Sequence, residues 1–261
     1  MPLSDRIRRP WFRFPAILGS IVVLSGCVHP DFGTRTRLDL SGPVLVDVST
    51  FAGDVNIRST GDAPGEPYVY VKPMSKYAAH RHDEGRARLS DIDWSVEVSR
   101  EQDPPVIRVR ASTFEHEQQR QRLHVTVSAP SIEGVRVRTR LGDIDVDRAS
   151  GPMDLETTDG DIDILADRPL DGPLTAVTTD GDIQLRTPPG TRGRLDFFTG
   201  DGRVVSRITR GSTRVQGRND DRSFQAVLNE GLEPFVLRTN DGMIRFMVKP
   251  SPRAQSSQLL D

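Results

Sequence analysis

Three aspartates at alternate positions, Asp159, Asp161 and Asp163, have the spacing in this chain that most suggests a metal site. Calcium takes several oxygen ligands, and closely spaced carboxylates supply them. An EF-hand loop would need glycine at its sixth position, where this chain has Ile164. Strand alternation would also hold Asp161 and Asp163 on one outer face and leave Asp159 in a turn. We therefore favour turn and solvated-face roles and keep calcium as the alternative.

Paired carboxylates also suggest acid and base catalysis of the kind that glycosidases use. That chemistry needs two carboxylates at a set separation in one pocket, with a raised pKa on the proton donor. The Asp-Gly-Asp motif recurs along the chain, whereas an active site is ordinarily unique. His80, His82 and Glu84 carry metal-ligand atoms but lack a second spaced pair. We predict no catalytic residues, no metal site and no enzyme, and the alternative is a carbohydrate-active hydrolase or lyase.

Arginines recur at short intervals between residues 203 and 222 and form a further candidate site. Arg210, Arg214 and Arg218 stand among small polar residues. Arginine binds phosphate and carboxylate groups in a bidentate manner. A solvated face is the simpler interpretation, and the functional hypothesis is a strip that binds anionic glycans.

An internal repeat supplies the elements that position these residues. Its glycines lie 18, 21, 21 and 40 residues apart, at Gly142, Gly160, Gly181, Gly202 and Gly242. Apolar and polar residues alternate on both sides of each turn, which is typical of half-buried strands. The unit is therefore strand, tight turn, strand. The turn residues predicted on this basis are Gly53, Asp54, Gly142, Asp143, Asp159, Gly160, Asp161, Asp180, Gly181, Asp182, Asp201, Gly202, Asp241 and Gly242.

Two arrangements of these strands remain open. Asp-Gly is a strong signal for a two-residue hairpin, which predicts an antiparallel meander or sandwich. A near-constant period of about 20 residues instead suits stacked coils, each of which buries its apolar face against its neighbours. We favour the second arrangement, an all-β solenoid of the parallel β-helix type.

The repeat also sets the predicted domain boundaries. Residues 38–249 are predicted to form the β-repeat domain, with regular repeats over 131–249. Between residues 59 and 130 the period lapses. We expect an irregular β insertion or cap there, because the open end of a solenoid needs covering. Residues 250–261 are predicted to be a disordered tail.

Residues 1–26 read as a targeting segment, with a basic start, a short apolar run and small residues at its end. Leu24-Ser25-Gly26-Cys27 looks like a bacterial lipobox, in which the chain is cut between Gly26 and Cys27 and the thiol of Cys27 receives a diacylglyceryl group. Cys27 is the only cysteine, so the chain cannot form an internal disulfide. We predict a lipidated tether over residues 27–37, which holds the protein to a membrane.

Lipid attachment predicts where the protein works. Val28 follows Cys27, and by resemblance to lipoprotein sorting this favours the outer membrane of a host with two membranes, facing the periplasm or the surface. Removing residues 1–26 takes away four arginines and one aspartate and changes the formal net charge from −2 to −5. An exported and mildly acidic chain is not expected to bind nucleic acid, which needs a basic surface.

The repeated Thr-x-x-Gly-Asp-Ile units, with strand-like segments such as residues 123–130 before them, resemble the bacterial "putative adhesin" family of β-strand-repeat domains of unknown function. The resemblance covers roughly residues 38–248. It implies an all-β, right-handed β-helix-like fold at the cell envelope and carries over no catalytic residues. We expect a lipid-anchored protein with a binding, adhesion or scaffolding role, whose partner is an envelope protein or a glycan.

Overall fold

The computed structural model describes residues 33–61, 65–76, 82–114 and 119–250. The targeting segment over residues 1–26, predicted to be a lipoprotein signal peptide, lies outside these ranges, as do Cys27 and the predicted tail from residue 251. The elements in chain order are β1 (Thr34–Arg37), β2 (Pro43–Ser49), β3 (Val55–Ser59), β4 (Tyr68–Ser75), α1 (His82–Ala87), η2 (Arg88–Asp91), β5 (Asp93–Ser99), β6 (Val106–Ser112), β7 (Gln121–Ala129), β8 (Ser131–Arg138), β9 (Ile144–Asp147), β10 (Met153–Glu156), β11 (Ile162–Leu165), β12 (Leu174–Val177), β13 (Ile183–Thr187), β14 (Gly193–Thr199), β15 (Val204–Ile208), β16 (Thr213–Asp220), β17 (Ser223–Leu228), β18 (Pro234–Thr239) and β19 (Ile244–Val248).

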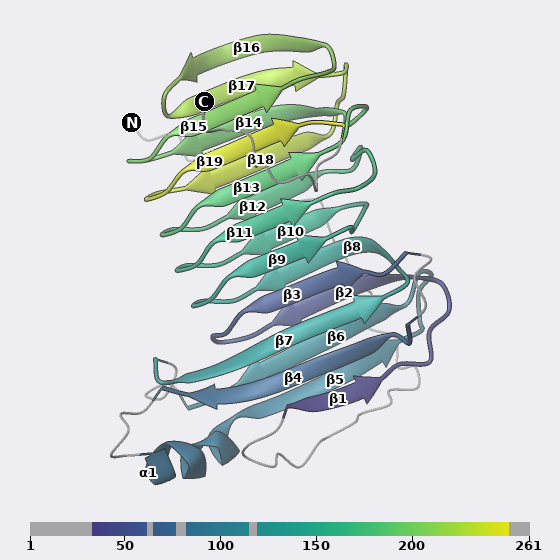
Figure 1. Cartoon of the computed structure of the whole chain (residues 1–261), viewed down its shortest axis with the longest axis vertical. Helices are drawn as coiled ribbons and strands as arrows, with labels where there is room; N and C mark the ends of the chain where they lie inside the picture. The colour runs from purple at the N-terminus through teal and green to yellow at the C-terminus, as the bar shows by residue number, and fades with distance from the viewer. Residues whose placement is uncertain (1–32, 62–64, 77–81, 115–118, 251–261) are drawn as a thin grey trace, which may run out of the picture.

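The described strands form two sheets that face each other along the length of the molecule (Figure 1). Sheet A has the order β16-β17-β14-β18-β12-β10-β8-β2-β6-β5, and sheet B has the order β1-β4-β7-β3-β9-β11-β13-β19-β15. A coil consists of one strand of sheet A, a turn and one strand of sheet B, as in β10 and β11. Coils stack through parallel pairing in both sheets. The predicted all-β solenoid is confirmed.

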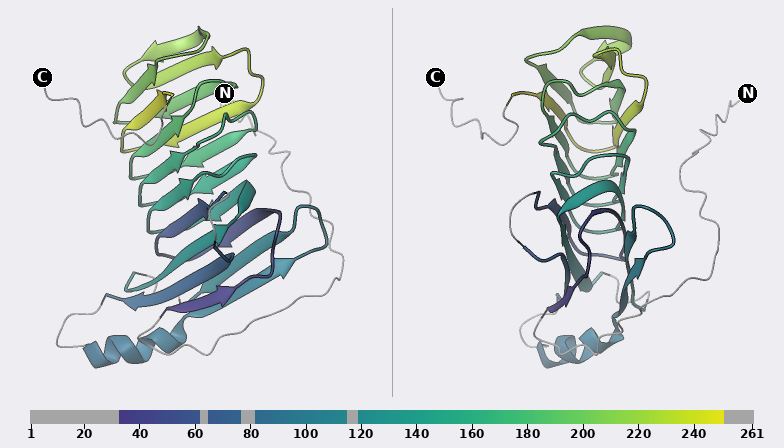
Figure 2. Two further views of the ribbon diagram at one scale, coloured as in Figure 1. Left: turned by 45° about the vertical axis from the view of Figure 1, so that its right-hand side comes forward. Right: turned by 90° about the vertical axis from the view of Figure 1, so that its right-hand side faces the viewer.

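The Asp-Gly turns do not form hairpins, so the alternative of an antiparallel meander is wrong. Strand β10 pairs in parallel with β8 and β12, whereas β11, which follows the turn, pairs in parallel with β9 and β13. The turn therefore carries the chain from one sheet to the other. The right-hand view of Figure 2 shows the two sheets as opposite walls that these turns connect.

The order of the coils in space differs from their order in the chain at both ends of the stack. The coil β2/β3 lies between the coils β6/β7 and β8/β9. At the other end, the coil β18/β19 lies between β12/β13 and β14/β15. The spacing of 40 residues between Gly202 and Gly242 reflects this arrangement, because the chain makes β16 and β17 before it returns to form β18.

Antiparallel strands extend the stack at each end. At one end β4 pairs with β7 and β1, β5 pairs with β6, and α1 and η2 connect β4 to β5. Residues 59–130 thus contain an end layer, together with the complete coil β6/β7. Strand β1 lies inside the segment predicted as a tether over residues 27–37, so residues 34–37 belong to sheet B instead. At the other end β16 and β17 form a hairpin beside β14 (Figures 1 and 2).

Apolar side chains from equivalent positions of successive coils fill the space between the sheets. In sheet B, Ile144, Ile162, Ile183 and Ile244 lie in register and are almost fully buried. Strand alternation places every second residue of each coil in this core, and the intervening residues face solvent. Aromatic rings fill the core near β14, where Phe197 and Phe246 pack edge to face with ring centroids 5.3 Å apart.

Candidate functional site

The predicted turn glycines stack on one another at one edge of the two sheets. Gly53, Gly142, Gly160 and Gly181 have positive φ, a conformation that glycine adopts without steric cost. A Cβ atom on Gly160 would overlap the carbonyl oxygen of Gly142, and one on Gly181 would overlap that of Gly160. Gly242 meets Gly181 and Gly202 meets Gly242 in the same way. We call this stack the turn column, and it requires glycine for both backbone conformation and close approach.

A buried threonine ties each turn to the next along the column. Thr157 Oγ1 donates a 3.0 Å hydrogen bond to the carbonyl oxygen of Gly142, and Thr178 Oγ1 makes the same bond to Gly160. Thr239 and Thr199 repeat it with Gly181 and Gly242. The hydroxyl thus satisfies a carbonyl that faces the next coil at the sheet edge. These threonines form a ladder of hydrogen bonds between coils, which we call the threonine ladder.

The aspartate after each turn glycine also connects neighbouring coils. Asp143 Oδ1 accepts the backbone N–H of Asp161 at 2.9 Å, and Asp161 Oδ1 accepts that of Asp182 at 2.7 Å. Asp54 begins this series, and Asp182 ends it on the N–H of Met243. The sequence predicted that these carboxylates lie in water at the start of a strand but did not reveal their bonds to the backbone. The regular period of the repeat could have indicated these bonds, because it places equivalent residues of successive coils one above another.

Carboxylates therefore crowd the outer face of sheet B. Asp145 and Asp163 are register partners on β9 and β11. Desolvation raises the pKa of Asp145, and the neighbouring charges of Asp163, Asp143 and Asp54 raise it further. Arg186 opposes this effect, and it binds Asp163 at 2.8 Å.

The structure separates the three aspartates of the calcium hypothesis. Asp159 lies in the turn and pairs by parallel bridges with Leu141 and Asp180. Asp161 bonds the next coil, and Asp163 binds Arg186 and Gln184 on β13. Among the residues that the structure describes, no group of three or more histidine, cysteine, aspartate or glutamate side chains is arranged to hold a metal ion. His80 and His116 lie outside those residues.

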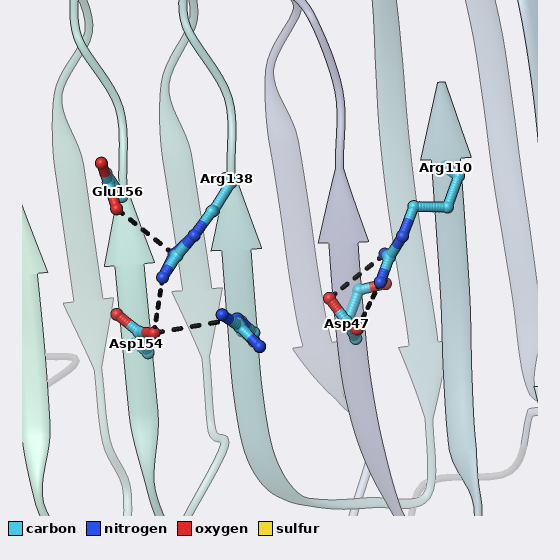
Figure 3. A network of polar contacts seen from close by, with 6 residues as sticks. Asp47, Arg110, Arg138, Asp154 and Glu156 are labelled. Carbon is cyan, nitrogen blue, oxygen red and sulfur yellow. Dashed lines mark hydrogen bonds and ion pairs between the residues drawn. The ribbon is translucent and has the colours of Figure 1, made fainter. Parts of the chain in front are cut away.

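The outer face of sheet A carries opposite charges on adjacent strands (Figure 3). Arg110 on β6 binds Asp47 on β2, and Arg138 on β8 binds Asp154 on β10 at 2.8 Å. Arg138 also lies 3.3 Å from Glu156. These partners belong to different coils, so the charges on this face neutralise one another across the stack.

The arginines of the predicted strip lie at the end of the stack formed by β15 and β16. Arg210 lies between these strands, and Arg214 and Arg218 belong to β16, whose eight residues are all exposed. Arg218 binds Asp220 on the same strand. Strand β15 is the edge of sheet B and β16 is the edge of sheet A, so the strip extends across the end of the molecule.

Residues 89–245 match the model of the family described as Toastrack DUF4097. A solved structure described as a "putative cell adhesion protein", from Clostridium sporogenes, is 9% identical, covers 84% of this chain and 99% of its own, and has a TM-score of 0.44. A "putative adhesin" from Bacteroides fragilis is 10% identical, covers 82% of this chain and 95% of its own, and has a TM-score of 0.36. No curated protein matches the chain. No helix within the described residues is long and apolar enough to cross a membrane.

Proposed function

The chain belongs to the Toastrack DUF4097 family, whose function is unknown, and on this basis we propose that it is a non-catalytic binding and scaffolding protein of the bacterial cell envelope. A lipid on Cys27 anchors it, and its partner is an envelope protein or glycan. The outer membrane is the site favoured by Val28 after Cys27. The main support for a non-catalytic role is that the aspartate after the turn glycine makes the same hydrogen bond to the next coil in successive repeats.

Each carboxylate after a turn glycine performs the same structural task in successive coils. Asp143 and Asp161 both accept a backbone N–H from the next coil. A glycosidase needs one pair of carboxylates that is set apart from the rest in a pocket. Asp145 and Asp163 come nearest to such a pair, since one has a raised pKa and the other binds an arginine, but they lie on an outer sheet face. This arrangement favours a scaffold over a hydrolase or lyase.

Anchoring at Cys27 would orient the stack. Strand β1 begins at Thr34, and a fully extended chain from Cys27 to Thr34 spans at most about 25 Å. Strand β1 lies at the end of the stack opposite to β15 and β16 (Figure 1). The anchored end would therefore face the membrane, and Arg210, Arg214 and Arg218 would project away from it. We assign these arginines to the binding of phosphate- or carboxylate-bearing envelope glycans.

Cross-linking in intact cells tests the proposal. The native protein and a Cys27→Ala variant are purified after cross-linking, and mass spectrometry identifies bound proteins and glycans. We expect membrane attachment and a specific partner with the native protein only. Equal membrane attachment of both forms would contradict lipidation, and a polysaccharide-degrading activity lost in both Asp161→Asn and Asp182→Asn would contradict the non-catalytic role.

The arginine strip is tested separately with lipopolysaccharide and peptidoglycan pulldown. Replacing Arg210, Arg214 and Arg218 by glutamine should remove glycan binding. Replacing Arg37, Arg100 and Arg168 removes the same charge from other exposed positions and should leave binding unchanged. Equal loss in both triple variants would show that only net charge matters and would contradict a specific strip.

A further inference from the structure

One residue position in the turn column changes type at the turn between β8 and β9, which the coils β2/β3 and β6/β7 separate from the end layer. Asp159, Asp180 and Asp241 occupy the position before the glycine and pair with one another by parallel bridges. The next position in this series is Leu141, which pairs with Asp159. The carboxylates of the series therefore stop at Leu141, one coil before the N-terminal copy of the motif at Gly53.

A cavity of about 280 Å³ lies at this point, with Leu141 in its lining. Its cationic residues are Lys76, which follows β4, and Arg122, which belongs to β7, and His124 on β7 also lines it. Its carboxylates, Asp54, Asp143 and Asp159, precede β3, β9 and β11. Since sheet B has the order β4-β7-β3-β9-β11, positive charges line one side of the cavity and negative charges line the other.

The middle of the cavity is internally paired. His124 Nδ1 lies 2.9 Å from Asp54 Oδ2, where the two sides meet. Arg122 donates to the backbone carbonyls of Gln119 and Gln121. Asp143 uses Oδ1 to accept the N–H of Asp161 and keeps Oδ2 for a further partner.

Two opposite charges at the outer positions have no such partner. Within the described parts of the chain, the Lys76 ammonium and the Asp159 carboxylate make no hydrogen bond or ion pair. Lys76 follows β4 and Asp159 precedes β11, so the pair Asp54 and His124 lies between them in strand order. A ligand that carries both charges can bind each of them through a charge-assisted hydrogen bond, which is stronger than a neutral one.

We propose that this cavity binds a small zwitterion, an amino acid or a short peptide. Its carboxylate lies against Lys76 and Arg122, and its ammonium group lies against Asp143 and Asp159. Leu141 contacts the carbon atoms between the two charges. The cavity is near the lower limit of the roughly 300–1,000 Å³ that small-molecule sites occupy, which restricts the ligand to a few carbon atoms between its charges. This site is independent of the lipid anchor and of the arginine strip.

Calorimetric titration of the purified full chain with a defined series tests the proposal. The probes are glycine, 4-aminobutanoate, 6-aminohexanoate and glycylglycine, with butanoate and butylammonium as compounds that carry one charge only. We expect at least one zwitterion to bind with a dissociation constant of about 1 mM or below, and both single-charge compounds to bind at least ~10-fold more weakly. The best member of the series reports the separation of the two charges, and its class distinguishes a free amino acid from a peptide.

The repeat provides a matched control for the variants. Lys76→Met and Asp159→Asn should each weaken binding of the best zwitterion by about tenfold or more, because each removes one charge–charge contact. Asp180→Asn changes the same turn position one coil further on, outside the cavity, and should change the dissociation constant less than about twofold. Leu141→Asp introduces the residue that other coils carry there, so the fold should tolerate it, but it should weaken binding by placing a carboxylate in the cavity.

Three outcomes would overturn the proposal. The first is the failure of every zwitterion to bind with a dissociation constant of about 1 mM or below. The second is equal binding of butylammonium and the best zwitterion, which would make the cavity a simple cation site. The third is equal loss in Asp159→Asn and Asp180→Asn, because that would show a general effect of net charge. Far-ultraviolet circular dichroism of each variant shows that the fold is intact.

Discussion

The hydroxyl of Thr178 donates a 3.0 Å hydrogen bond to the carbonyl oxygen of Gly160, its neighbour in the adjacent coil. The side chain is almost fully buried, so a Thr178→Val variant keeps the shape and loses the bond. We expect the free energy of unfolding to fall by about 1–3 kcal/mol, because the carbonyl is left without a partner. Thr175→Val on the outer face of β12 is the control and should change it by less than about 0.5 kcal/mol. Urea denaturation measures both, and equal effects would contradict a structural role for the threonine ladder.

The close stacking of the turn glycines predicts a severe effect of Gly181→Ala. The new Cβ atom would overlap the Gly160 carbonyl oxygen, and the positive φ would be strained. We expect destabilisation of about 3 kcal/mol or more, since overpacking and backbone strain each cost about 1–3 kcal/mol. Gly42→Ala, where no atom lies within 4 Å of the new Cβ, should have little effect. A thermal unfolding midpoint for Gly181→Ala close to that of Gly42→Ala would show that the turn column can relax.

The carboxylate of Asp161 has a structural role that two substitutions can separate from a catalytic one. Asp161→Ala removes the acceptor for the N–H of Asp182 and should destabilise the fold by about 1–2 kcal/mol. Asp161→Asn keeps an oxygen acceptor at the same place and removes one negative charge from a crowded face, so its stability should equal or exceed that of the native chain. Chemical denaturation at neutral pH measures the difference. Equal destabilisation by both variants would contradict the hydrogen-bonding role.

Crowding of carboxylates on sheet B predicts a dependence of stability on pH. The folded state raises the pKa of Asp145 above its ordinary value of 3.8, so the ionised form of this group destabilises the fold. This destabilisation is fully present above the raised pKa and disappears as the pH falls below 3.8. Asp145→Asn should therefore increase the urea midpoint at pH 7 relative to the native chain, and the increase should vanish in acid.

A control for this pH effect is Asp167→Asn, which changes an exposed aspartate in the loop after β11. It should leave the urea midpoint nearly unchanged at both pH values, within about 0.5 kcal/mol in stability. If Asp145→Asn lowered the midpoint at pH 7, the assignment of a repulsive environment to Asp145 would be wrong.

The sequence predicted the coil because each repeat carries its own local signals. Asp159 and Gly160 indicate the turn, and the alternation around Ile162 indicates which face is buried. The stacking order of the coils cannot be predicted from such local signals. Coils with similar inner faces compete for the same neighbours, and the sequence of one coil does not say which other coil lies beside it. The insertion of β18/β19 between β12/β13 and β14/β15 therefore became clear only from the structure.

The candidate sites show the same difference between what one repeat reveals and what depends on how distant segments are placed. The recurrence of Asp161 and Asp182 indicated a structural role before any geometry was known. The cavity beside Leu141 could be found only after β4 and β7 were placed, because Lys76 and Arg122 are distant from Asp159 in the chain. One signal was present in the sequence, namely leucine at the position where four other turns have aspartate.

The position of the coil β18/β19 has a consequence for how the protein is synthesised. Strands β12 and β14 are made before β18, yet each of them pairs with β18 in the finished sheet. While the ribosome is still adding residues 229–248, β14 can pair with β17, but the stack has an open place between two coils that already exist. Coil-by-coil folding from the N-terminal side therefore cannot complete this molecule. Its core closes only when the last coil to be translated enters the interior of the stack.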